Sequence, residues 1–243
     1  MNRTLIIVPT YNEAENLPGL VKSLRNCAQD ADVLIVDDGS PDGTGHLADE
    51  LAASDGAVNV LHRESKEGLG VAYRAGFDWG LARPEYNWFV EMDADGSHRP
   101  DELRRLRNAA HSADLVIGSR WVPGGRVVDW PLGRRLISRA GTAYAHLMLR
   151  LPVRDATAGF RVLSRRALES VHLETIASHG YCFQIDVTRR LHEAGLRIVE
   201  VPVTFVERRQ GASKMTTGIV LEALWRVTLW GVAHWFTPRR RPR

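Results

Sequence analysis

Short, mainly apolar runs of four or five residues recur along the first half of the chain, at 4–8, 33–36, 58–61, 88–92 and 114–118. Runs this short are typical of strands buried on both faces of a sheet. Longer segments between them carry apolar residues three or four positions apart and predict helices over 15–29, 44–54, 70–82 and from Pro100 onward. Strands alternating with helices predict an α/β fold, a mostly parallel sheet sandwiched by helices.

The second half of the chain is less regular. Helices are expected over 134–149 and 183–194, and strands over 158–163 and 198–206. Pro202 cannot donate a ladder hydrogen bond, so the last strand should lie near an edge or a bulge. The helix over 134–149 carries an apolar stripe of Leu136, Ile137, Ala140, Tyr144, Leu147 and Met148.

Residues 219–236 are nearly all apolar and contain three tryptophans, but Glu222 and Arg226 interrupt them one helical turn apart. Each charge costs about 2.5–3.5 kcal/mol at a bilayer centre, which disfavours a membrane span. A basic tail follows, so the segment suits a membrane interface, or alternatively a helix packed on the domain or on a partner. We expect residues 1–214 to form the catalytic domain and residues 215–243 an amphipathic interfacial helix with its basic tail.

Composition adds a division of charge to this picture. With 243 residues, 44% of them hydrophobic and 25% charged, the chain is long enough for one large globular domain. Residues 1–117 hold 11 Lys/Arg against 20 Asp/Glu, whereas residues 118–166 hold ten arginines against two acids. The acidic part suits a cation, and the basic part suits phosphates or a membrane surface. No basic stripe with interleaved stacking aromatics is present, so nucleic acid is not expected as a partner.

Asp93 and Asp95 are the first candidates for chemistry, because they follow the apolar run 88–92 and precede Gly96 and Ser97. In a strand, residues two apart point to the same side, so the two carboxylates should converge where the strand ends. Like charges this close repel unless a cation joins them, and oxygen ligands suit Mg²⁺ or Mn²⁺. The alternative is an acidic turn that caps the following helix.

Several motifs accompany this acidic pair in a fixed order. They are Pro9-Thr10-Tyr11-Asn12-Glu13, the stretch 36–44 (VDDGSPDGT), Asp93-Ala94-Asp95, and further matches at 118–125, 130–131, 134–138, 158–160 and 208–214. On these motifs the chain resembles the family 2 glycosyltransferases of the GT-A (nucleotide-diphospho-sugar transferase) fold. More narrowly, it is similar to the polyprenol-phosphate (dolichol-phosphate) mannosyltransferases. The resemblance extends from residue 4 to about residue 214.

The resemblance implies transfer of mannose from GDP-mannose to a polyprenyl (dolichyl) phosphate, with inversion and with Mg²⁺ or Mn²⁺ as cofactor. It implies metal binding by Asp93 and Asp95, with Ser97 where the family commonly has Gln. It implies catalytic roles for Asp95, Arg120 and Arg134. The residues that it implies for the nucleotide sugar are Pro9, Tyr11, Glu13, Val36, Asp38, Asp93, Ala94, Asp95, Arg120, Arg208 and Lys214.

A phosphate acceptor is already anionic at neutral pH and needs no general base. It needs cations, and Arg120, Arg134 and Ser138 match the family's acceptor-phosphate positions, the last two lying one helical turn apart. Arg208 and Lys214 fall on a Gly-containing segment suited to closing over the diphosphate, or else on a flexible basic loop.

For each of three acidic residues near these motifs, the sequence is compatible with two roles. Asp155 either orients an arginine or hydrogen-bonds the sugar. Asp37 either caps its turn or supports Asp38. Glu13 would otherwise be a solvated charge at a helix start.

Two other functions remain open from the sequence. One is the same chemistry with UDP-glucose, although related enzymes of that kind often carry two C-terminal transmembrane helices. The other is a non-catalytic GT-A scaffold that recruits membrane subunits through residues 215–243, which would have no need of the acidic pair and the arginines. A nucleotidyltransferase is disfavoured, because the expected Gly-rich, Lys-containing N-terminal loop is missing. The expected location is peripheral, on the cytoplasmic face of the membrane, and a membrane anchor subunit is left open.

Overall fold

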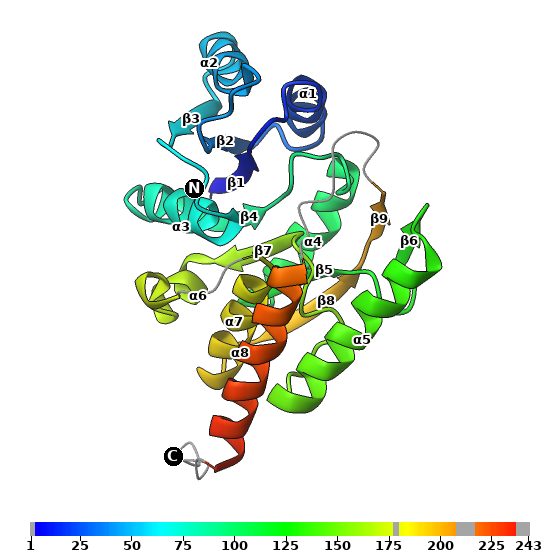
Figure 1. The fold of residues 1–243 in the computed structure, drawn as a ribbon. Helices are drawn as coiled ribbons and strands as arrows, with labels where there is room; N and C mark the ends of the chain where they lie inside the picture. Colours follow the sequence, from blue (N-terminus) through cyan, green and yellow to red (C-terminus); the bar gives the residue numbers. More distant parts are fainter. Residues whose placement is uncertain (1–2, 177–179, 208–216, 237–243) are drawn as a thin grey trace.

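A seven-stranded sheet forms the centre of the computed structural model, which describes residues 3–176, 180–207 and 217–236 (Figure 1). The spatial order of its strands is β3-β2-β1-β4-β7-β5-β8. The apolar runs of the sequence supply these strands: β1 (Arg3–Thr10), β2 (Ala31–Asp37), β3 (Val58–His62), β4 (Tyr86–Glu91), β5 (Leu115–Ser119), β7 (Arg161–Ser164) and β8 (Ile198–Pro202).

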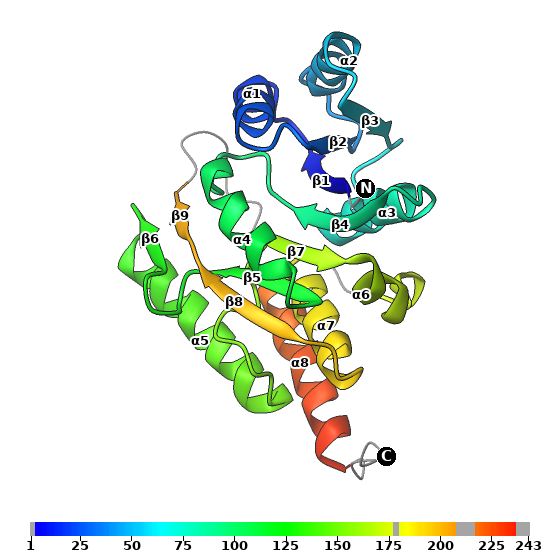
Figure 2. The same ribbon diagram turned by 180° about the vertical axis from the view of Figure 1, so that it is seen from behind.

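Helices cover both faces of the sheet (Figure 2). The hydrophobic cluster on one face contains residues of α1 (Leu17–Cys27), α2 (Thr44–Ser54) and α4 (Leu103–Ala110), the last of which continues the short 3₁₀ turn Pro100–Glu102. The cluster on the other face contains residues of α3 (Leu69–Leu81), α5 (Leu132–Leu149), α6 (Arg165–Ser170), α7 (Gly180–Glu193) and α8 (Thr217–Phe236). Along β1, Leu5 and Ile7 belong to the second cluster and Ile6 and Val8 to the first, as strand alternation requires. The predicted two-sided burial is confirmed.

Strand direction decides which loops meet at one edge of the sheet. Neighbouring strands are parallel except that β7 runs antiparallel to both β4 and β5. The carboxyl ends of β1, β2, β4 and β5 therefore share one edge, and the loop before β7 reaches the same edge because β7 is reversed. The loops that carry the predicted motifs are brought together in this way.

The predicted strand over 198–206 is wrong in one respect, because the chain leaves the main sheet in the middle of it. β8 ends at Pro202 as the edge strand, and the buried Val203 donates its N–H to the Ser119 carbonyl at 3.1 Å. The next residues form β9 (Thr204–Val206), which pairs with β6 (Arg126–Val128) in a separate two-stranded sheet. Pro202 thus lies at an edge, as expected, and also marks the point where one strand becomes two.

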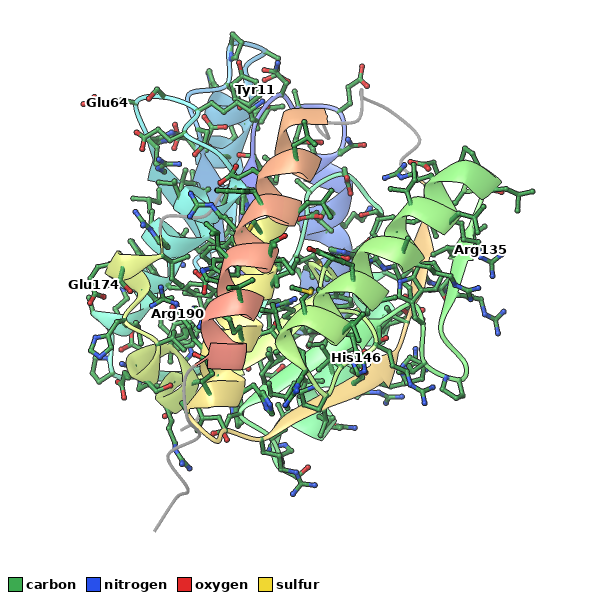
Figure 3. The ribbon with its side chains drawn as sticks, turned by 60° about the horizontal axis from the view of Figure 1, so that its bottom comes forward. Tyr11, Glu64, Arg135, His146, Glu174 and Arg190 are labelled. Atoms are coloured by element: carbon green, nitrogen blue, oxygen red, sulfur yellow. The ribbon has the colours of Figure 1, made fainter. Side chains whose placement is uncertain are left out.

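Helix α8 packs on the domain by one side and lies next to α5 (Figure 3). Val227 is 2% exposed and joins the core, and the hydroxyls of Tyr144 and Thr228 are 2.6 Å apart across the two helices. Gly231 permits close approach, because a Cβ there would lie 2.8 Å from the Met148 methyl carbon. The charges that interrupt the apolar segment, Glu222 and Arg226, pair with each other on α8 at 2.8 Å.

The outer sides of α5 and α8 are apolar and exposed. In the described part of the chain, every large hydrophobic side chain that is exposed belongs to one of these two helices. On α5, part of the predicted stripe turns outward instead of into the core. No helix within the described ranges combines the length and hydropathy required to cross a bilayer. The exposed side chains are Leu132, Leu136, Ile137 and Leu147 of α5 and Leu221, Leu224, Trp225, Leu229 and Val232 of α8.

Candidate active site

The turn after β2 is built around Asp37. Its carboxylate accepts hydrogen bonds from the Ser40 N–H at 3.1 Å, the Ser40 hydroxyl at 2.6 Å and the Thr10 hydroxyl at 3.0 Å. Asp37 therefore caps its turn, which decides between its two interpretations. Asp38 is also buried and pairs with Arg63, and burial raises the pKa of its carboxyl despite the nearby guanidinium.

Glu13 and Tyr11 lie on the neighbouring turn, after β1. Glu13 is 7% exposed and accepts a hydrogen bond from the Asn16 side chain at 2.9 Å, so the interpretation as a solvated helix-start charge is wrong. The Lys66 ammonium lies 4.1 Å from the centre of the Tyr11 ring. Pro9 and Val36 pair in register on β1 and β2 just before these turns. Five of the residues that the resemblance implies for the nucleotide sugar thus lie on β1 and β2 or directly after them, at one part of the edge.

The acidic pair lies beyond β4 and not within it. β4 ends at Glu91, so strand alternation does not position Asp93 and Asp95, and that part of the prediction is wrong. Their loop turns at Gly96, whose φ is +73°. The Asp93 carboxylate accepts a hydrogen bond from the Tyr73 hydroxyl at 3.2 Å, and the Asp95 carboxylate accepts one from the Ser97 N–H at 3.0 Å. The loop and its hydrogen bonds therefore orient both groups.

His98 holds the backbone of this loop in place. Its Nδ1 accepts a hydrogen bond from the Asp93 N–H at 3.1 Å, which requires an unprotonated Nδ1. Its ring stacks on Phe160 at 5.2 Å and meets Phe205 edge-on at 5.5 Å. His98 is 4% exposed and supports the backbone of the acidic motif.

The donor groups around Asp93 and Asp95 fit a hard divalent cation bound jointly with a substrate. Both side chains offer only oxygen, as Mg²⁺ and Mn²⁺ prefer. In the described ranges, no three His, Cys, Asp or Glu side chains are grouped so as to hold a metal, which does not fit a closed all-protein site. Mg²⁺ is commonly held by one or two carboxylates together with substrate phosphates. Ser97 is fully buried and its hydroxyl has no hydrogen-bond partner among the described residues; its role as a ligand stays a prediction.

Arg120 is locked by Asp155. Its Nε lies 2.8 Å from one Asp155 oxygen and its Nη2 lies 2.6 Å from the other, and its backbone N–H also donates to Asp155 at 2.8 Å. Nη2 further donates to the Thr157 hydroxyl at 2.9 Å. Asp155 is fully buried, so of its two interpretations the structure supports the orienting of an arginine. The guanidinium is also within 5.4–5.6 Å of the ring centres of Trp121, Trp130 and Phe205.

Arg134 and Ser138 both lie on α5, one turn apart as predicted. Arg134 forms an ion pair with Glu207 and lies 4.4 Å from the centre of the Trp130 ring. The side chains of Arg134 and Glu207 remain 20% and 23% exposed, so an anion from solution can reach this pair. The other two predicted cations, Arg208 and Lys214, lie outside the described residues.

A hollow that opens to solvent joins the acidic motif to both arginines. The structure thus brings together three of the predicted residues, Asp93, Arg120 and Arg134, while Tyr11, Glu13 and Asp38 are not part of the lining. The lining residues are Leu69, Asp93, His98, Arg120, Trp130, Arg134, Thr157, Gly159, Gln184 and Phe205.

Sequence reasoning missed the buried charges beneath this hollow. Glu91 and Arg161 are both fully buried, 3.8 Å apart; burial raises the pKa of Glu91 to about 7 and lowers the pKa of Arg161. Arg161 also donates to the carbonyls of Ala156 at 2.7 Å and Ala158 at 2.6 Å, which fixes the loop between Asp155 and β7. The available signal was an arginine inside an apolar strand, directly after the motif at 158–160.

The family model "Glycosyl transferase family 2" matches residues 5–171. The chain belongs to glycosyl transferase family 2. It is 56% identical over 231 residues to "Undecaprenyl-phosphate mannosyltransferase" of Micrococcus luteus, covering 95% of both chains. It is 53% identical over 232 residues to "Polyprenol monophosphomannose synthase" of Mycolicibacterium smegmatis, covering 95% of this chain and 87% of the relative.

Solved structures place this family 2 chain in the GT-A fold. Glucosyl-3-phosphoglycerate synthase of Mycobacterium tuberculosis, in complex with uridine diphosphate, superposes with a TM-score of 0.66 at 20% identity, covering 93% of this chain and 80% of that chain. The same enzyme with Mn²⁺, UDP-glucose and phosphoglyceric acid gives the same TM-score and coverage. The predicted GT-A fold is therefore confirmed, and the protein is a glycosyltransferase.

Proposed function

We propose that this enzyme transfers mannose from GDP-mannose to a polyprenyl monophosphate, which releases GDP and forms polyprenyl-phosphate mannose with inversion at the anomeric carbon. The observation that carries the proposal is the hollow in which Asp93 and two arginines, Arg120 and Arg134, line the same space. Its charges suit a reaction between two anionic substrates. The two relatives at 53% identity and above, both named for mannosyl transfer to polyprenyl phosphates, support this choice.

On the donor side, Asp93 and Asp95 would hold Mg²⁺ or Mn²⁺, which when bound neutralises the diphosphate and stabilises the departing GDP. The structural relative solved with Mn²⁺ and UDP-glucose supports a divalent cation. Ser97 would be a further ligand. The nucleotide would lie along the edge formed by Pro9, Tyr11, Glu13, Val36, Asp38 and Ala94, and Arg208 and Lys214 would close over its diphosphate.

On the acceptor side, a phosphate oxygen forms a bond to the anomeric carbon as the bond from that carbon to the GDP oxygen breaks, and the electron pair leaves with GDP. The phosphate is already ionised, so no side chain has to remove a proton. Arg134 and Ser138 would bind the phosphate, with Arg134 exchanging its contact with Glu207 for phosphate oxygens. Arg120, whose charge Asp155 largely balances, would offer rigidly oriented N–H donors without reorganising.

Transfer of radiolabelled sugar into organic-extractable polyprenyl phosphate tests the proposal most directly. We expect incorporation from GDP-mannose that depends on Mg²⁺ or Mn²⁺ and is lost with a chelator. Faster incorporation from UDP-glucose would favour the glucosyltransferase alternative. No incorporation from any sugar nucleotide, with membranes supplied, would favour the non-catalytic scaffold.

We further propose that the outer sides of α5 and α8 rest on the cytoplasmic face of the membrane. Leu132, Leu136 and Leu147 are four and eleven residues apart, so they share one side of α5, and they are 66–76% exposed. Apolar side chains gathered on this face favour a lipid surface. Arg134 and Ser138 lie on the same helix, which would bring the lipid phosphate to the active site while the polyprenyl chain stays in the bilayer.

Replacing two outward side chains of α5, in the variant Leu136→Gln/Ile137→Gln, should weaken binding to phosphatidylglycerol-containing vesicles by at least about tenfold, because each buried apolar side chain contributes about 1.5–3 kcal/mol. Both side chains are more than half exposed, so stability should not change. Vesicle co-sedimentation measures the effect. Replacing the four arginines of the basic tail, Arg239, Arg240, Arg241 and Arg243, by glutamine should weaken binding further and in a salt-sensitive way. His146→Gln, an exposed change on the same helix, is the control, and unaltered vesicle binding in the double variant would contradict the proposed surface.

A further inference from the structure

Arg161, the first residue of β7, is completely buried. A guanidinium in such a place is costly unless its N–H groups find acceptors. Its Nε donates to the carbonyl of Ala158 at 2.6 Å, and its Nη2 donates to that of Ala156 at 2.7 Å. Its Nη1 donates to the Gln184 carbonyl at 2.9 Å and to the Thr188 hydroxyl at 3.0 Å. Two of these acceptors belong to the loop before β7, so this side chain fastens the loop.

The Glu91 carboxylate balances the buried charge. Glu91 is the last residue of β4 and pairs in register with Arg161 across the antiparallel ladder. A buried ion pair is often no more stabilising than apolar side chains of the same volume, so stability alone does not account for this one. The acidic loop begins directly after Glu91. One guanidinium therefore joins the end of β4 to the loop before β7.

The fastened loop contacts both chemical halves of the hollow. On the basic side, Asp155 holds the Arg120 guanidinium, and the Thr157 hydroxyl accepts a hydrogen bond from the same group at 2.9 Å. On the acidic side, a Cβ on Gly159 would lie 3.5 Å from a carboxylate oxygen of Asp93. These three loop residues alternate with the two whose carbonyls the buried guanidinium binds. The backbone that carries them is thus held at every second residue.

We propose that Arg161 is a positioning residue for sugar transfer. Through the loop that it fastens, it keeps the Arg120 donors and the Asp93 carboxylate at a fixed separation. The inference rests on the proposed function, in which two anionic substrates meet between these groups. A misplacement of about 1 Å in such a site can cost about 100-fold in rate. Arg161 is not part of the lining itself, so it acts only through the loop.

The test uses Arg161→Lys, which keeps the positive charge beside Glu91 but replaces a planar fork of donors by a single ammonium nitrogen. One nitrogen cannot hold all the carbonyls that the fork holds, so the loop should shift. We expect kcat for transfer from GDP-mannose to fall about 10- to 100-fold. The dissociation constant of GDP measured with Mn²⁺ by calorimetry should change by less than about threefold, because Tyr73 and His98 still hold the acidic loop.

Arg165→Lys is the matched control. Its guanidinium also binds three backbone carbonyls, at 2.6–3.0 Å, but beside the start of β4 and not beside the acidic loop. We expect the melting temperature to fall in both variants and kcat to fall only in Arg161→Lys. An equal loss of kcat in the two, measured well below both melting temperatures, would reduce Arg161 to a role in the fold. The carbonyls bound by Arg165 are those of Leu81, Arg83 and Tyr86.

A double-mutant cycle with Asp155→Asn tests the route of the effect. If Arg161 acts through the contact of Asp155 with Arg120, Arg161→Lys should cost little further kcat in the Asp155→Asn background. Full additivity would contradict this route. Should Arg161→Lys not fold, Arg161→Gln/Glu91→Gln removes both buried charges together and should show the same fall in kcat. Absence of transfer from GDP-mannose by the wild type would overturn the proposed function itself, so the two failures are distinguishable.

Discussion

Asp95→Asn should lose about 1000-fold or more of the metal-dependent transfer activity, with no rescue by excess Mg²⁺ or Mn²⁺. One carboxylate of the pair is removed, so the cation that neutralises the diphosphate binds weakly and the departing GDP loses its stabilisation. An asparagine oxygen can still accept the Ser97 N–H, so the loop should keep its shape. Steady-state transfer assays and calorimetry of GDP binding with and without Mn²⁺ measure the effect.

Asp101→Asn is the matched control, because Asp101 is exposed and pairs only with Arg99 among the described residues. It should retain wild-type activity and wild-type metal dependence. Metal-dependent GDP binding by Asp95→Asn at wild-type affinity, together with full activity, would refute the assignment of this pair to the cation. A large drop in the melting temperature of Asp95→Asn would instead mean that the carboxylate serves the fold.

Much of the fold follows from short-range patterns in the sequence. The run 5–8 is apolar on every residue because β1 is covered on both faces, and such a run indicates a buried strand without reference to its partners. The reversal of β7 is a long-range property: residues 161–164 have the same apolar pattern whichever way the strand runs. The change of sheet at Val203 depends likewise on the distant pairing of β9 with β6.

The same difference between short-range patterns and long-range contacts applies to the candidate site. Residue types and spacing are enough to suggest a cation at Asp93 and Asp95, yet the strand argument for their geometry is wrong because the loop, Tyr73 and His98 orient them. Asp155 could not be assigned from sequence, since its pairing with Arg120 spans 35 residues.

Arg134→Ala should lower kcat/KM for the polyprenyl phosphate about 10- to 150-fold, while KM for GDP-mannose changes by less than about threefold. A charge-assisted hydrogen bond to phosphate contributes about 1.5–3 kcal/mol, and Arg134 would provide it only to the acceptor. Arg134→Lys should restore part of the activity, because an ammonium keeps the charge and loses the guanidinium fork. Varying each substrate at saturating concentration of the other separates the two effects.

The ion pair with Glu207 has to be separated from the phosphate in this experiment. Removal of Arg134 leaves a partly buried carboxylate facing the site, which by itself would repel the acceptor. Arg134→Ala/Glu207→Gln removes that repulsion, so its remaining loss measures the contact with phosphate. Arg135→Ala, the next residue on α5, is exposed and should leave both substrates unaffected (Figure 3). If the double variant recovers wild-type kcat/KM for the lipid, Arg134 serves only to neutralise Glu207. If kcat/KM falls equally for the lipid and for GDP-mannose, Arg134 does not act on the acceptor alone.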